Sequence, residues 1–143
     1  MTNEQRAEAI IKKYEFNFSE IPKEEVRELI EKEIFYFQEG SSEYIRVLCG
    51  YLYCIGDFSD VSLMEKAKYS INMDVGCMID REWIDSLKGI ENEYTRPREE
   101  IIESFIAYPI TKILKQTMMN GDTNSNLSVK FSITLDISRL SGR

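Results

Sequence analysis

The sequence of this protein predicts a mainly α-helical fold, an irregular helical bundle that ends in one amphipathic β-strand. Up to residue 121, apolar side chains recur at three- and four-residue steps, which is the period of an amphipathic helix. Residues 127–137 instead alternate apolar and polar side chains, which is the period of a strand. A chain of 143 residues is long enough for one core. We therefore expect a helical domain over residues 1–121, followed by a flexible link and the strand over residues 122–143.

The first half of the chain predicts three helices. Residues 3–14 carry a narrow apolar face, and we expect a peripheral helix there. Residues 22–37 begin with proline and have glutamates in the first turn, both typical of a helix start. Residues 42–55 are apolar nearly all round, which predicts the central helix of the bundle. Between the first two, residues 14–18 alternate aromatic and polar side chains, so we expect a short strand able to pair with the C-terminal one.

The second half predicts three more elements. A helix over residues 59–71 forms a hairpin with the helix before it, because the connection is short. Residues 72–80 lack a clear period, and we expect a bent, partly buried connection. Asp80 then caps a short helix that ends at residue 88. Residues 97–118 form the longest apolar stripe, and Pro109 in its middle is expected to kink or split that helix.

The C-terminal strand is expected to determine how the chain associates. Six apolar side chains fall on one of its faces: Leu127, Val129, Phe131, Ile133, Leu135 and Ile137. A strand needs a neighbour for its backbone donors and acceptors, and an open edge of this length invites another chain. The neighbour is residues 14–18, a second copy of the chain, or another protein.

Composition narrows the class of partner and the compartment. The net charge is −7, and acids outnumber bases up to residue 93. The negative electrostatic field of such a chain repels nucleic acid and raises the rate of encounter with a basic protein. The three cysteines are odd in number and show no C-x-x-C spacing, which is typical of a reducing compartment. No apolar run is long enough to cross a bilayer, and the N-terminal residues lack the pattern of a signal peptide. We expect a cytoplasmic protein that binds neither nucleic acid nor membrane.

Residues suited to catalysis are scarce. The chain has no histidine, which removes the commonest general base and imidazole metal ligand. It also lacks the glycine-rich phosphate-binding motifs. The densest group of carboxylates is Asp57, Asp60, Asp74, Asp80, Glu82 and Asp85. Their spacing matches no calcium loop, and Asp57, Asp60 and Asp80 are explained as helix caps. The sequence therefore predicts no enzyme, no metal site and no cofactor.

The second and third predicted helices are rich in aromatic residues. There are more of them than the apolar face of each helix can bury. Exposed tyrosines beside acids are typical of protein recognition, because aromatic anchors supply contact area and acids steer the encounter. The alternative is ordinary packing between helices. The predicted partner-binding residues are Tyr36, Tyr44, Tyr53, Asp57, Asp60, Asp80, Glu82, Trp83 and Asp85.

Residues 50–84 resemble small bacterial helical proteins of the HEAT-like type. The resemblance lies in the Gly56-Asp57 turn with Asp60, in the helix end at residues 67–69 and in the connection before Trp83. It implies HEAT-like helical hairpins and a protein-binding function, because some of those relatives are immunity proteins of polymorphic toxins. As an immunity protein, the chain would occlude a basic toxin surface by mimicking an anionic substrate.

Two other functions compete with immunity. In the first, the chain is a structural or regulatory subunit that pairs through its C-terminal strand into a homodimer. In the second, the helices enclose an apolar pocket for a small ligand.

Overall fold

The computed structural model describes residues 1–119, with side chains described up to residue 108. These residues belong to two compact units. The first consists of Met1–Tyr14 and Phe18–Thr95, and the second of Glu15–Asn17 and the chain from Arg96 onward. The described part of the chain is mainly helical, as the sequence predicts.

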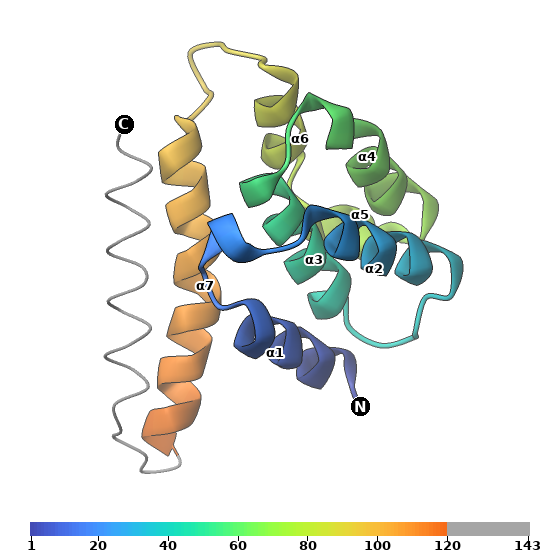
Figure 1. Ribbon diagram of the computed structural model, residues 1–143, viewed down its shortest axis with the longest axis vertical. Helices are drawn as coiled ribbons and strands as arrows, with labels where there is room; N and C mark the ends of the chain where they lie inside the picture. The colour runs from blue at the N-terminus through green and yellow to red at the C-terminus, as the bar shows by residue number, and fades with distance from the viewer. Residues whose placement is uncertain (120–143) are drawn as a thin grey trace. The chain divides into compact units, whose positions relative to one another are not determined.

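The first unit contains six α-helices and two short 3-10 helices (Figure 1). They are α1 (Asn3–Tyr14), η1 (Phe18–Glu20), α2 (Lys23–Phe35), α3 (Glu43–Ile55), η2 (Phe58–Asp60), α4 (Val61–Ser70), α5 (Met73–Met78) and α6 (Arg81–Lys88). Each of α1 to α4 and α6 lies where an apolar stripe predicts a helix.

Helix α3 is the centre of this unit. It contacts α1, α2, α4, α5 and α6, and Figure 1 shows it among them. Nine of its side chains or backbone positions are buried: Tyr44, Ile45, Val47, Leu48, Cys49, Gly50, Tyr51, Leu52 and Tyr53. Its burial on all sides confirms the central helix that its apolar composition predicts. Burial raises the pKa of the Cys49 thiol to about 12, so this cysteine serves as a small core residue.

The connection predicted over residues 72–80 is wrong, because the structure has a helix there. Asn72 caps α5, its side-chain oxygen accepting the Val75 amide hydrogen at 2.9 Å. At the other end, the Lys68 ammonium group donates to the carbonyl oxygens of Gly76 and Ile79. Side chains thus satisfy backbone hydrogen-bonding groups at both ends of α5. With only six residues, this helix is too short to show an apolar period in the sequence.

The strand predicted over residues 14–18 is also wrong. Tyr14 is the last residue of α1, and Phe18 begins η1. Glu15 between them has a φ of 51°, which lies in the left-handed region and does not continue a strand. The described residues contain no strand, so the intrachain partner proposed for the C-terminal strand does not exist at this position.

The second unit contains α7 (Arg98–Met119) among its described residues. Ile101, Ile102, Phe105 and Ile106 are buried along it, and so is Phe16 in the Glu15–Asn17 segment. The helix continues through Pro109, so the predicted split does not occur.

The predicted domain boundary at residue 121 and the strand over residues 127–137 lie outside the described residues. Among residues 1–119, no helix combines the length and the apolar character that crossing a membrane requires.

Candidate protein-binding surface

Four of the nine predicted partner-binding residues are buried, which corrects their assignment to a surface. Tyr44, Tyr53, Asp60 and Trp83 are at most 8% exposed. Tyr53 and Trp83 stack with ring centroids 6.3 Å apart, and the Tyr53 hydroxyl shares a 2.7 Å hydrogen bond with Ser86 Oγ. These two rings join α3 to α6, so their role in the structure is core packing.

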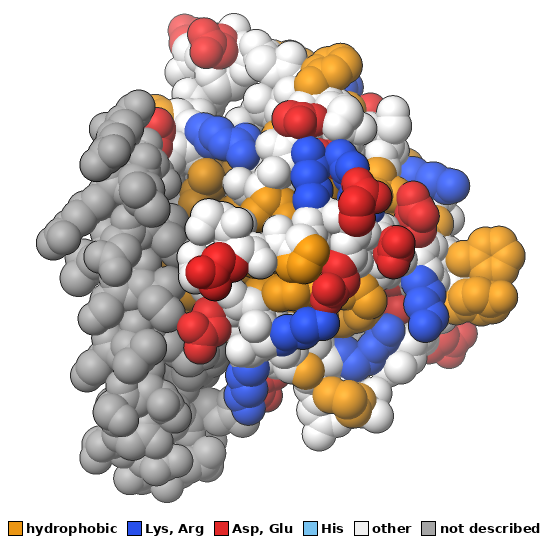
Figure 2. All heavy atoms as spheres, in the orientation of Figure 1, with side chains coloured by type: hydrophobic (Ala, Val, Ile, Leu, Met, Phe, Trp, Pro, Cys, Tyr) orange, Lys and Arg blue, Asp and Glu red, His pale blue; other side chains and the backbone are white. Residues whose placement is uncertain are grey.

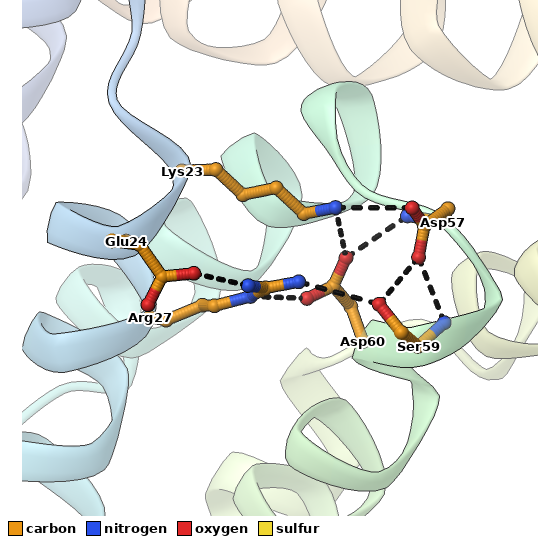
Figure 3. Close-up of polar contacts among 6 residues, drawn as sticks. All are labelled: Lys23, Glu24, Arg27, Asp57, Ser59 and Asp60. Atoms are coloured by element: carbon orange, nitrogen blue, oxygen red, sulfur yellow. Dashed lines mark hydrogen bonds and ion pairs between the residues drawn. The ribbon is translucent and has the colours of Figure 1, made fainter.

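Asp60 belongs to an ion-pair network with α2, shown in Figure 3. Its Oδ1 accepts from Arg27 Nε at 2.6 Å, and its Oδ2 pairs with Lys23 Nζ at 3.0 Å. Asp57 completes the network through Lys23 Nζ at 3.2 Å. Asp57 and Asp60 also form a capping box at the start of η2, which confirms part of their predicted role as caps. Their charge is therefore largely satisfied within the chain.

Gly56 is required for this arrangement. A Cβ at this position would lie 2.4 Å from the carbonyl oxygen of Leu52 and 2.6 Å from Asp60 Oδ2. Both distances are shorter than a van der Waals contact allows. The absence of a side chain at residue 56 therefore lets the Asp60 carboxylate approach the end of α3 and receive the Asp57 amide hydrogen at 2.9 Å.

Both carboxyl groups have lowered pKa values. Hydrogen bonds from the Ser59 hydroxyl and amide, and then from Lys23, lower the pKa of Asp57 to about 2. Burial alone would raise the pKa of Asp60, but the hydrogen bonds from Arg27, the Asp57 amide and Lys23 outweigh it and lower the pKa.

These shifts predict that the protein loses stability in acid. A carboxyl whose pKa is lower in the folded state stabilises the fold above its unfolded pKa and loses that contribution as pH falls through its folded pKa. The free energy of unfolding should therefore fall between about pH 4 and about pH 2, the range bounded by the ordinary value of 3.8 and the Asp57 value of about 2. Urea unfolding followed by circular dichroism across this range measures the loss. In the Asp57→Asn variant the dependence on pH should be weaker, and an equal slope in both proteins would contradict the assignment.

The acids at the start of α6 are the second predicted group. Asp80 is exposed and stands at the helix N-cap, but its side chain makes no capping hydrogen bond there, contrary to prediction. Asp85 pairs with Arg81 at 3.1 Å, and Arg81 also donates to the Tyr69 hydroxyl at 2.6 Å. Glu82 is partly exposed. This surface combines acids with a neighbouring base and is not uniformly negative.

Tyr36 is the predicted tyrosine that reaches the surface, and it does so beside Phe35. The exposed fractions are 77% for Phe35 and 71% for Tyr36, and the rings meet edge to face with centroids 4.7 Å apart. They stand at the end of α2, where Figure 2 shows hydrophobic side chains projecting at the right edge of the view. Figure 2 also shows charges of both signs interleaved over the rest of this face. The pair therefore forms a projecting apolar contact on a charged surface.

The connection that follows Tyr36 is held by a buried polar network. The Asn3 side-chain amide donates to the carbonyl oxygens of Gln38 at 3.0 Å and Ser41 at 2.7 Å. Arg6 donates to Asn3 Oδ1 at 2.9 Å and binds the Glu33 carboxylate with two hydrogen bonds of 2.7 and 3.0 Å. Asn3 and Glu33 are 2% and 3% exposed. The network therefore fixes residues 38–41 against α1.

Two neighbours complete this network. The Arg6 guanidinium lies 3.9 Å from the centroid of the Tyr44 ring, which accounts for the burial of this predicted partner-binding residue. Gly40 has a φ of 125°, a conformation that residues with a side chain rarely adopt. The connection thus depends on glycine at this point.

A shallow groove runs beside this connection. It is lined by residues 1–5 and 38–41 and has a volume of about 460 Å³. Two of the lining residues, Glu4 and Glu39, are acidic, and none is lysine or arginine. The groove and the aromatic pair adjoin the same connection, and we call them together the α2-end surface.

Sequence reasoning missed Phe35 as part of the α2-end surface, and it missed Asn3, Arg6 and Glu33 as the buried network behind it. A detectable signal for Phe35 is that it precedes Tyr36 directly, because consecutive residues on a helix point in different directions and one stripe does not bury both. The role of Asn3 has no such signal, since its partners lie 35 and 38 residues away.

No family model, curated protein or solved structure matches this chain. The resemblance of residues 50–84 to HEAT-like proteins therefore stays a prediction. Within the part of the chain that the structure describes, no three acids or cysteines are grouped closely enough to hold a metal ion.

Proposed function

We propose that this chain is a cytoplasmic, non-catalytic protein-binding module. Its most concrete form is an immunity protein that occludes a basic surface of a toxin domain. The observation that carries the proposal is the exposed pair of Phe35 and Tyr36 beside an acidic groove. Binding is proposed at this surface and not at Asp57 and Asp60, because those two carboxylates are paired with Lys23 and Arg27.

Exposed aromatic rings support protein binding for an energetic reason. Leaving two large rings in water costs free energy that burial in an interface recovers. Aromatic side chains are also the residues on which binding energy concentrates, because they bury a large area with few rotatable bonds. Nothing in the packing of α2 requires both rings, since Val26 and Ile30 already supply its fully buried face.

The charge supports a basic partner. The chain has a net charge of −7. Within four positions of the pair in the sequence, the exposed charged residues are Glu31, Lys32 and Glu39, so acids outnumber bases there. A negative field of this kind raises the association rate with a cationic protein and does so less at high salt.

Affinity capture from a lysate of the native cells tests the proposal. The wild-type chain is compared with a Glu31→Lys/Glu39→Lys variant as bait, and retained proteins are identified by mass spectrometry. We expect the wild-type bait to retain a basic protein. Its purified form should associate about tenfold more slowly with the charge-reversed variant at low salt, and the difference should shrink as salt is added.

Three outcomes would contradict the proposal. One is that the wild-type bait retains only copies of itself, which would indicate a homo-oligomer. Another is a retained protein that is acidic. A third is an association rate that is the same for both baits at every salt concentration.

A further inference from the structure

We propose that the outer face of α2 is the docking surface for a partner segment that carries basic side chains at one end and an apolar side chain at the other. The basic groups pair with Glu28 and Glu31, and the apolar side chain packs on Phe35 and Tyr36. This inference rests on the proposed function, and it names the helix and the kind of partner segment that meet.

The sequence of α2 places acids and an aromatic ring on one face of the helix. Four exposed residues recur at steps of four, three and four positions, which is the spacing of neighbours on a helix surface: Glu24, Glu28, Glu31 and Phe35. The fully buried Val26 and Ile30 lie on the opposite face, and α2 contacts α3 and α4 (Figure 1). We call the three glutamates the acidic stripe, and Phe35 stands at its end.

Two of the three carboxylates in the acidic stripe are available to a partner. Glu24 pairs with Arg27, whose guanidinium also pairs with Asp60. The carboxylates of Glu28 and Glu31 form no ion pair or hydrogen bond with any residue that the structure describes. An arginine or lysine placed beside them would form charge-assisted hydrogen bonds with acids that have no internal competitor.

Lys32 is the base beside this stripe. It is exposed, follows Glu31 directly, and forms no ion pair with an acid in the described part of the chain. Its place in the last turn of α2 suits the negative end of the helix dipole. One ammonium group opposes two free carboxylates, so the face keeps a negative charge. Lys32 nevertheless repels a bound cation, and removing its charge should strengthen binding.

The aromatic pair gives the docking surface an apolar end. Phe35 lies four residues after Glu31, so their side chains are neighbours on the helix surface. Phe35 also meets the Tyr36 ring with centroids 4.7 Å apart. Glu28 and Phe35 are seven residues apart, which is about 10 Å along the helix axis. A partner segment therefore reaches both ends if its basic and apolar side chains have a similar separation.

A second copy of the chain is a poor occupant of this face. Each copy has a net charge of −7, and two acidic stripes placed together would repel one another. A basic segment complements the charge and covers the exposed rings at the same time.

Titration with synthetic helical peptides tests this inference. The probe is a capped alanine- and glutamine-based peptide of about 18 residues, long enough to form a helix. It carries two arginines three positions apart and a leucine seven positions from the first arginine. One control peptide has glutamate in place of arginine, and the other has the leucine directly beside an arginine. Two-dimensional NMR of the ¹⁵N-labelled full chain should show amide shift changes concentrated at residues 24–36 with the probe, and much smaller changes with either control.

Charge variants test the acidic stripe. Glu28→Gln/Glu31→Gln should weaken binding of the probe about fivefold at low salt, because two surface ion pairs are lost. Lys32→Gln should strengthen it about twofold. Glu91→Gln/Glu93→Gln is the matched control, since it makes the same change in net charge at exposed glutamates between α6 and α7. Its effect on binding should be much smaller.

Aromatic variants test the other end of the surface. Phe35→Ser/Tyr36→Ser should weaken binding of the probe about tenfold or more, because both aromatic contacts are removed. Phe58→Ser, at another exposed aromatic residue, is the matched control and should leave binding unchanged. Thermal unfolding of the charge and aromatic variants should match that of the wild type, since all the substituted side chains are exposed.

Several results would overturn the inference. They are no binding of the probe, shift changes centred on another surface, equal binding of the glutamate peptide, or dimers without peptide that Phe35→Ser/Tyr36→Ser abolishes. Equal weakening by the two glutamine pairs would also overturn it, because only net charge would then matter.

The lysate capture separates failure of this inference from failure of the proposed function. If a basic protein is retained but binds Glu28→Gln/Glu31→Gln as tightly as Glu91→Gln/Glu93→Gln, the function stands and docking on the acidic stripe is wrong. If no basic protein is retained, the proposed function itself fails.

Discussion

Replacing Asp60 with alanine is expected to lower the free energy of unfolding by about 3–5 kcal/mol. The change removes the carboxylate that forms ion pairs with Arg27 and Lys23. It also removes the acceptor of the Asp57 amide hydrogen, so one half of the capping box is lost. Urea unfolding at neutral pH measures the loss.

Asp80→Ala is the matched control for this prediction. Asp80 is an exposed aspartate at a helix N-cap whose side chain makes no capping hydrogen bond, so its loss should change stability by no more than about 0.5 kcal/mol. Equal losses in the two variants would show that the network of Figure 3 does not stabilise the fold.

Trp83→Ala is expected to cost about 3–5 kcal/mol of stability. Trp83 is 2% exposed, stacks on Tyr53 and has the Arg46 guanidinium 5.4 Å from its ring. Alanine would leave a cavity between α3 and α6. Urea unfolding followed by circular dichroism measures the cost, because the variant lacks the chain's one tryptophan.

The control for Trp83 is Tyr94→Ala, since Tyr94 is 84% exposed and should tolerate truncation. Wild-type tryptophan emission should also lie at the short wavelengths typical of a buried indole. Two results together would contradict the burial of Trp83: a Trp83→Ala variant as stable as the wild type, and wild-type emission at the long wavelengths typical of an indole exposed to water. They would indicate that Trp83 lies on the surface, as the sequence predicts.

The helices that could be predicted are those with a long apolar stripe. Helix α3 is apolar around its whole circumference, and this alone predicts its central position. Helix α5 could not be predicted in the same way, because it is only six residues long and its ends are satisfied by Asn72 and Lys68. The alternation at residues 14–18 predicted a strand, whereas Glu15 turns the chain between two helical elements.

The candidate site was harder to predict than the fold. Asp57 and Asp60 look alike in the sequence, yet the side chain of Asp57 is 66% exposed and that of Asp60 is 1% exposed. Both carboxylates pair with Lys23, but only Asp60 also pairs with Arg27, which lies 33 residues earlier in the chain. The same limit applies to the buried network of Asn3, Arg6 and Glu33, which depends on packing between elements distant in sequence.

The most direct test of the account is the equilibrium affinity of the partner retained from the lysate for three proteins. These are the wild-type chain, Phe35→Ser/Tyr36→Ser and Phe58→Ser. We predict that the double serine variant binds about tenfold or more weakly, while Phe58→Ser binds as the wild type does. Equal affinities of all three proteins, or a loss only in Phe58→Ser, would contradict binding at the α2-end surface.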